Sequence, residues 1–229
     1  MNQGLRRAGG IAALAAALAF VFVFALVATT LAPMTAPELA FGEYLRLHQA
    51  HGTLIYIWHF AMYIAFGLCL LIVALALHER LKESSPNLSA IAAALGLIYS
   101  AFVLLGGLLT IHGDEAVLAL ASRDPVAADA LRGTIAAVTL CVDSSDRLLG
   151  CLWIGVASLA ALKPKTLPRG LALLGLFIGA PGIIGMALPS LLALSYVFGL
   201  GIIVWSAWLG IVMLRGTPAA KASAGMMTA

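Results

Sequence analysis

The feature that most constrains this chain is a series of long apolar runs separated by short polar segments. A bilayer core about 30 Å thick is crossed by about 20 residues of helix, and only helices and closed barrels satisfy their backbone hydrogen bonds in lipid. The runs lie at about 10–32, 53–77, 88–111, 138–162, 170–188 and 190–214. We therefore expect an all-α, six-helix transmembrane bundle forming one domain over residues 1–216, followed by a short disordered cytoplasmic tail at 217–229.

The composition excludes several classes of protein. Of 229 residues, 62% are hydrophobic and 10% are charged, whereas soluble domains are nearer half apolar and a quarter charged. An ordinary soluble enzyme, a disordered chain and a nucleic-acid binder are thereby excluded, and the expected partner is the lipid bilayer. The first run is longer than the apolar region of a signal peptide, which favours a retained anchor over a cleaved signal.

The distribution of Lys and Arg predicts the orientation, because these residues are enriched in cytoplasmic loops. With the N-terminus inside, only Arg46, Arg123 and Arg132 fall outside, and Arg147 falls within a run. The nine inside are Arg6, Arg7, Arg80, Lys82, Lys163, Lys165, Arg169, Arg215 and Lys221. Both termini are therefore predicted to be cytoplasmic, in the inner membrane of a bacterium.

The fourth run contains three charged residues, Asp143, Asp146 and Arg147. A charge at the centre of a bilayer costs about 2.5–3.5 kcal/mol on insertion scales, so such residues normally pair or line a polar cavity. Asp143 and Arg147 have the i,i+4 spacing of a helical ion pair, which leaves Asp146 without an intrahelical partner. Counting back from the end of the run places this group near the outer interface.

Four histidines are predicted to lie in the same outer layer. His48 and His51 precede the second run, His59 lies at its outer boundary, and His112 follows the third run. Together with the charged group they define a candidate pocket for a small ligand or a proton. Its residues are Asp143, Asp146, Arg147, His51, His59 and His112.

The same residues allow two other functions. His59, His112 and Asp146 could bind a divalent metal, since imidazole and carboxylate suit zinc or a similar ion, and a metalloenzyme could then act at the outer lipid surface. His59 and His112 could instead ligate a haem. Alternatively, the polar groups only tie helices together in a structural or accessory subunit. The sequence has no P-loop, G-x-S-x-G or G-x-G-x-x-G motif, so whether it is an enzyme stays open.

The fifth run carries small residues on one helical face, Gly175, Gly179 and Gly182. Such a stripe lets two helix backbones approach closely. We expect it to pack against another helix, within the chain or in an oligomer.

The fourth run with Asp143 and Asp146, the turn Lys165-Thr166-Leu167-Pro168-Arg169 and the following segment 170–176 carry a resemblance to a known family. In this order of elements the chain resembles a family of uncharacterised bacterial six-span membrane proteins, a domain of unknown function. The resemblance covers most of the chain and implies a six-helix inner-membrane fold. It supplies no activity and no site residue, and the pair His48 and His51 departs from the family's pattern.

Overall fold

The computed structural model describes residues 3–36, 39–163, 166–187 and 193–215, and contains no strand within these ranges. The helices are α1 (Gln3–Ala28), the 3-10 helix η1 (Ala32–Thr35), α2 (Phe41–His59), the π-helix η2 (Phe60–Ala65), α3 (Phe66–Leu81), α4 (Pro86–Ala121), α5 (Pro125–Ala161), α6 (Arg169–Ala187) and α7 (Ala193–Arg215). The prediction of an all-α fold is confirmed.

Five helical segments in the described ranges are long and apolar enough to cross a membrane. They are Gln3–Ala28, Phe41–Leu81, Pro86–Ala121, Pro125–Ala161 and Val197–Arg215. The run predicted at 170–188 coincides with α6, whose described apolar part, Arg169–Pro181, is shorter. The junction between the last two predicted runs, Lys165, Lys221 and the predicted tail at 217–229 lie outside the described residues.

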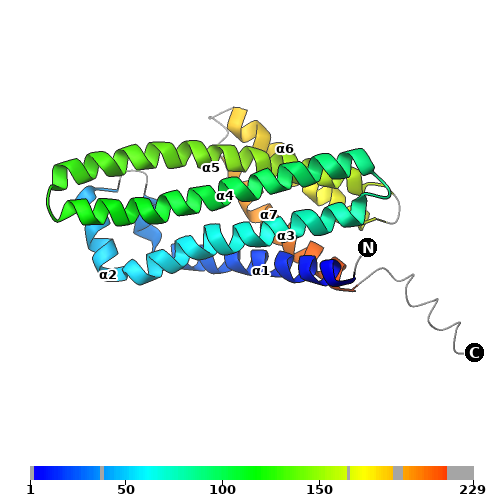
Figure 1. Ribbon diagram of the computed structural model, residues 1–229, viewed down its shortest axis with the longest axis horizontal. Coiled ribbons are helices and arrows are strands. Elements are labelled where there is room, and N and C mark those ends of the chain that lie inside the picture. The colour runs from blue at the N-terminus through cyan, green and yellow to red at the C-terminus, as the bar shows by residue number, and fades with distance from the viewer. Residues whose placement is uncertain (1–2, 37–38, 164–165, 188–192, 216–229) are drawn as a thin grey trace, which may run out of the picture.

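The two longest helices, α4 and α5, form an antiparallel hairpin that is longer than a bilayer is thick (Figure 1). Thirty-six residues at 1.5 Å each span about 54 Å, against about 30 Å of hydrocarbon. The polar segment that follows the predicted run 88–111 continues as helix on both sides of a short turn, to Ala121 in α4 and from Pro125 in α5. Polar residues do not end a helix, whereas Asp124 followed by Pro125 starts one, with the Asp124 carboxylate accepting from the Ala127 amide at 3.0 Å.

The helices pack as a closed ring in the order α1, α3, α4, α5, α6, α7 and back to α1. The start of α1 lies at the same end of the molecule as the α3–α4 turn, and α2 lies at the opposite end, beside the tip of the α4–α5 hairpin (Figure 1). The core of the ring is built around buried aromatic residues, among them Tyr99, Trp153 and Trp205.

Glycines set the closest helix contacts in this ring. A Cβ on Gly107 of α4 would overlap the Cβ of Tyr63 in η2. A Cβ on Gly175 would overlap the Ser158 hydroxyl of α5, and one on Gly179 would lie 3.0 Å from the Cys151 carbonyl oxygen. The face predicted from Gly175 and Gly179 therefore packs against α5 of the same chain. The surroundings of Gly182 are outside what the structure describes, and an oligomer through this face stays a prediction.

The contact at Gly107 yields a stability prediction. Gly107→Ala should lower the thermal unfolding temperature in detergent, because the Cβ of Tyr63 cannot rotate away and the two helices must separate. We expect a loss of about 1–3 kcal/mol, the usual cost of overpacking. Gly155→Ala is the matched control, since a Cβ at Gly155 meets nothing within 4 Å. Equal unfolding temperatures for the two variants would contradict the close contact.

Candidate functional site

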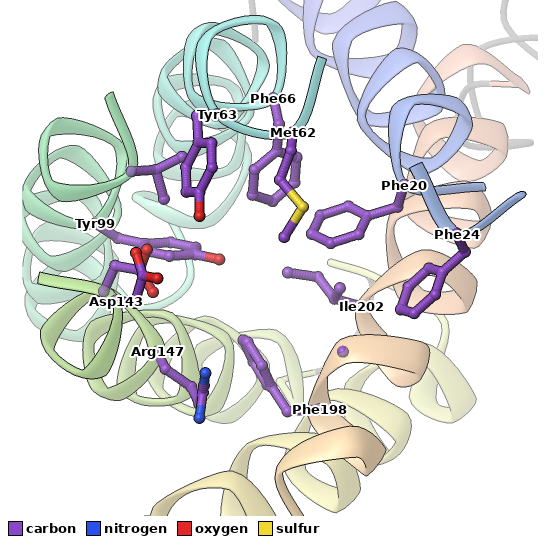
Figure 2. Close-up of a pocket in the computed structure, with 13 residues that line it drawn as sticks. Phe20, Phe24, Met62, Tyr63, Phe66, Tyr99, Asp143, Arg147, Phe198 and Ile202 are labelled. Carbon is purple, nitrogen blue, oxygen red and sulfur yellow. The ribbon is translucent and has the colours of Figure 1, made fainter. Parts of the chain in front are cut away.

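A cavity of about 360 Å³ lies inside the ring, at the level where η2 meets α4 and α5. One wall is aromatic and apolar, formed from α1, α3 and α7 by Phe20, Phe24, Phe66, Phe198 and Ile202. The opposite wall carries the polar groups of Tyr63, Tyr99, Asp143, Asp146 and Arg147 (Figure 2). The cavity is therefore amphiphilic, with its charge confined to one side.

The charged wall is formed by one face of α5. Asp143, Asp146 and Arg147 are spaced i, i+3 and i+4, which places them together on a helix surface. All three line the cavity. The sequence spacing thus predicts which charged residues are neighbours, and the ring of helices decides that they face a cavity.

The three charges do not neutralise one another. Among the ion pairs of the described residues, none joins Arg147 to Asp143 or Asp146 within 4.0 Å. Figure 2 shows the Arg147 guanidinium directed away from the Asp143 carboxylate. The Asp143 Oδ1 atom is buried and has no hydrogen-bond partner among the residues that the structure describes. Since unpaired buried polar groups are costly, this wall is suited to a partner that supplies hydrogen-bond donors or positive charge.

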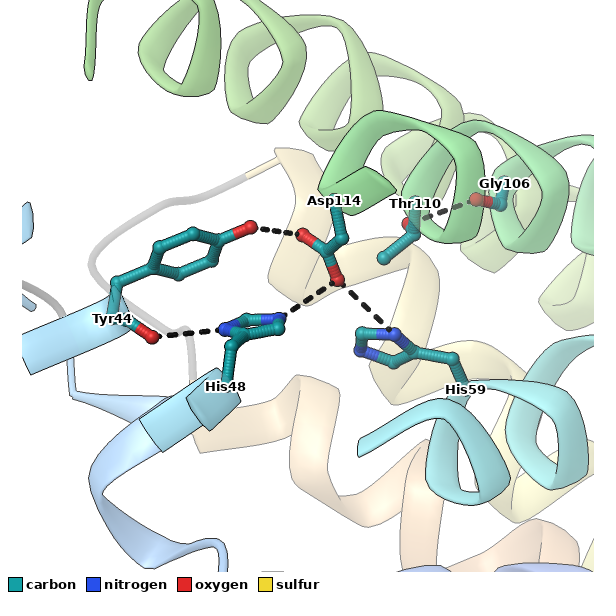
Figure 3. Close-up of polar contacts among 6 residues, drawn as sticks. All are labelled: Tyr44, His48, His59, Gly106, Thr110 and Asp114. Atoms are coloured by element: carbon teal, nitrogen blue, oxygen red, sulfur yellow. Dashed lines mark hydrogen bonds and ion pairs between the residues drawn. The ribbon is translucent and has the colours of Figure 1, made fainter. Parts of the chain in front are cut away.

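A second polar cluster surrounds Asp114 near the C-terminal end of α4 (Figure 3). The Tyr44 hydroxyl donates to Asp114 Oδ1 at 2.7 Å. His48 Nε2 lies 3.4 Å and His59 Nδ1 lies 3.5 Å from Asp114 Oδ2. The two imidazoles are buried, with side chains only 6% and 7% exposed. One carboxylate therefore holds three side chains of α2, and we call these four residues the Asp114 cluster.

The contacts of His48 determine its protonation state. Its Nδ1 lies 2.9 Å from the Tyr44 carbonyl oxygen, which can only accept, so Nδ1 carries a hydrogen. Its Nε2 faces the Asp114 carboxylate and also favours a hydrogen. Burial by itself lowers the pKa of His48, but the contacts with Asp114 and with the Tyr44 carbonyl outweigh burial and raise the pKa above its usual value. His48, which precedes the predicted run 53–77, is thus stabilised as an imidazolium paired with Asp114.

Arg132 links the start of α5 to this cluster. Its guanidinium carbon lies 5.6 Å from the centre of the Tyr44 ring and 5.7 Å from that of Phe41, within cation–π range. The same guanidinium donates to Asp129 at 2.9 Å. Burial and then the Asp114 charge raise the pKa of Tyr44, so its hydroxyl stays protonated as the donor to Asp114.

The structure distributes the six predicted pocket residues over different places. Asp143, Asp146 and Arg147 share the cavity, and His59 belongs to the Asp114 cluster. His51 lies at a kink of α2, with φ −133° and ψ 20°, and its side chain forms neither a hydrogen bond nor an ion pair with any described residue. His112 is on the opposite face of α4 from Asp114, because two residues turn a helix by about 200°.

The predicted metal and haem ligands have different surroundings. His112 is 69% exposed and its Nδ1 lies 2.9 Å from Glu115, His59 faces Asp114, and Asp146 lines the cavity. Among the described residues, no group of three or more His, Cys, Asp or Glu side chains is arranged to hold a metal ion. The set His59, His112 and Asp146 and the pair His59 and His112 therefore share no site in this part of the chain.

Sequence reasoning missed Tyr44 and Asp114 as site residues. The spacing of Tyr44 and His48, one helical turn apart, was a usable signal. Asp114 could be placed only by knowing that α4 continues past the apolar run. Comparisons with protein-family models, curated proteins and solved structures found no match.

The His48–Asp114 pair predicts a pH-dependent stability. The protonated imidazole stabilises the fold below its ordinary pKa of about 6.5, and this stabilisation is lost as pH rises through the raised pKa of the folded state. The unfolding temperature of the wild-type protein in detergent should therefore fall over that range. Asp114→Asn should lower it at low pH and flatten the curve. Glu83→Gln, which removes an exposed acid that belongs to none of the ion pairs of the described residues, should leave the curve unchanged. A wild-type curve in Asp114→Asn would refute the pairing.

Proposed function

We propose that this chain is a six-span protein of the bacterial cytoplasmic membrane, with both termini inside. We further propose that its cavity binds a small amphiphilic molecule carrying a cationic amine, without covalent chemistry. The observation that carries the second proposal is the amphiphilic cavity, with two carboxyl groups and one guanidinium on a single wall and no ion pair between them.

The ring arrangement supports α6 as the sixth span, because α6 occupies the place between α5 and α7. Basic residues also join the two turns at the predicted cytoplasmic end. The Lys163 ammonium donates to the Ser84 carbonyl oxygen at 2.7 Å, and the Arg80 guanidinium donates to that of Thr166 at 2.8 Å. Basic residues at this end agree with a cytoplasmic location.

Labelling of single cysteines tests this topology. In a variant with Cys69, Cys141 and Cys151 replaced by Ser, Ser122→Cys should react with an impermeant thiol reagent in intact cells. A second variant on the same background, Glu83→Cys, should react only after the membrane is permeabilised. Both positions are exposed at turns, so they are matched in accessibility. The reverse pattern would overturn the orientation, and equal labelling of both positions in intact cells would overturn the single span proposed between them.

The chemistry of the cavity favours an amine over an acid. Two carboxyl groups against one guanidinium leave a negative balance when all three are ionised, and no described residue donates a hydrogen bond to Asp143 Oδ1. The aromatic wall suits an apolar body and adds cation–π attraction for a positive charge close to it. The volume of about 360 Å³ is within the range of small-molecule sites, about 300–1,000 Å³.

Two probes with the same apolar body test the ligand class. Equilibrium dialysis against protein in nanodiscs, with empty nanodiscs as the baseline, should show 1-naphthylmethylamine binding at least about tenfold more tightly than 1-naphthylmethanol, a difference of about 1.4 kcal/mol. Asp146→Asn should abolish this preference. Glu83→Gln is the control, because it removes one exposed acid far along the chain from the cavity. Equal binding of both probes, or a full preference in Asp146→Asn, would refute the amine site.

A further inference from the structure

The Asp114 cluster and the cavity are connected along one helix contact. On α2 and η2, His59 and Tyr63 are one turn apart, and their ring centres lie 6.3 Å from each other. On α4, Asp114, Thr110 and Gly106 follow one another at intervals of four residues and share a face. This face of α4 packs against η2, so polar groups on both sides form a line from the outer end of the molecule inward (Figure 3).

Tyr63 is the step between the two sites. Its side chain lines the cavity, and its hydroxyl is directed toward the polar wall (Figure 2). On the facing helix, the Thr110 hydroxyl donates to the Gly106 carbonyl oxygen at 2.9 Å, and Thr110 lies on the same face of α4 as Asp114 and Gly106. Tyr63 therefore lies between His59 of the Asp114 cluster and the cavity.

Gly106 brings Tyr63 and Asp143 together. The position of a Cβ on Gly106 is 3.3 Å from Asp143 Oδ1 and 3.7 Å from Tyr63 Cε1. Because both distances are measured from the same point, Asp143 Oδ1 and Tyr63 Cε1 are at most about 7 Å apart. The carboxylate oxygen at this point is the buried one without a hydrogen-bond partner.

We propose that protons from the outer side enter at the Asp114 cluster and reach Asp143 and Asp146 through His59 and Tyr63, so that protons and a cationic ligand exchange at the same carboxyl groups. In each transfer, His59 releases one ring proton as it accepts another, and the Tyr63 hydroxyl gives its proton to Asp143 while it takes one from His59. No electrons move. The ligand part of this inference rests on the proposed amine site.

Other charged groups border this path and set its direction. Asp114 faces His48 and the Tyr44 hydroxyl as well as His59, and Arg132 lies over the Tyr44 ring. At the inner end Tyr63 lines the cavity together with Asp143, Asp146 and Arg147 of α5. The outer end can thus store a proton on an imidazole, and the inner end offers carboxylates as acceptors.

A pH jump tests the path without any ligand. Protein in nanodiscs is shifted from high to low pH, and the rise of the protonated-carboxyl infrared band is followed in time. The part of the band that belongs to the cavity is identified by its loss in Asp143→Asn and Asp146→Asn. In Tyr63→Phe, which keeps the ring that packs on Gly107, this part should rise at least about tenfold more slowly. Tyr56→Phe, which removes the hydroxyl of an exposed tyrosine of the same helix, should match the wild type.

His59→Gln is a second variant, used in case Tyr63→Phe does not fold. It should also slow the rise of the cavity part of the protonated-carboxyl band. A wild-type rate in either folded variant would overturn the path, because protons would then reach the carboxyl groups directly through the cavity. This result is separable from the probe experiment. If protonation is slow in Tyr63→Phe but no amine binds, only the amine site fails. If the amine binds but protonation in Tyr63→Phe is as fast as in the wild type, only the proton path fails.

Discussion

The close packing of η2 on α4 is the contact on which the rest of the structure depends. Gly106 and Gly107 have no side chains, so the Tyr63 ring and the Asp143 carboxylate can both lie against α4 at this level. The π-helical turn at Phe60–Ala65 changes the direction of the side chains that follow it. The cavity and the Asp114 cluster therefore lie on either side of the contact between η2 and α4.

The packing of the ring leaves the charged groups of Asp143, Asp146 and Arg147 without an ion pair between them. A bundle that needed its charges only for cohesion would join Arg147 to a neighbouring acid, since the spacing on α5 allows it. In the described part of the chain these groups instead line a shared cavity. Under the proposed function, a cationic ligand or a proton in this cavity offsets the cost of holding charge in an apolar region, and the opposite aromatic wall adds apolar contact area for the ligand.

The Asp114 cluster depends on the length of α4 and α5. Both helices are longer than a bilayer is thick, so α2 can pack against α4 beyond the apolar run 88–111. Asp114 accepts from the Tyr44 hydroxyl, and its contact with His48 favours the protonated imidazole and raises the pKa of His48. The cavity and the Asp114 cluster are thus distinct in environment, one within the ring of helices and one toward the tip of the α4–α5 hairpin.

The sequence by itself determined the helical class, the places of the apolar runs and the neighbourhood of Asp143, Asp146 and Arg147, because helical periodicity and the thickness of a bilayer are local constraints. It did not determine which polar groups meet. His112 and Asp114 are two residues apart and point to opposite sides of α4, whereas Tyr44 and Asp114 are distant in the chain and share a hydrogen bond. Only the tertiary structure decided these contacts, since they depend on where α4 ends, where α2 bends and which helices close the ring.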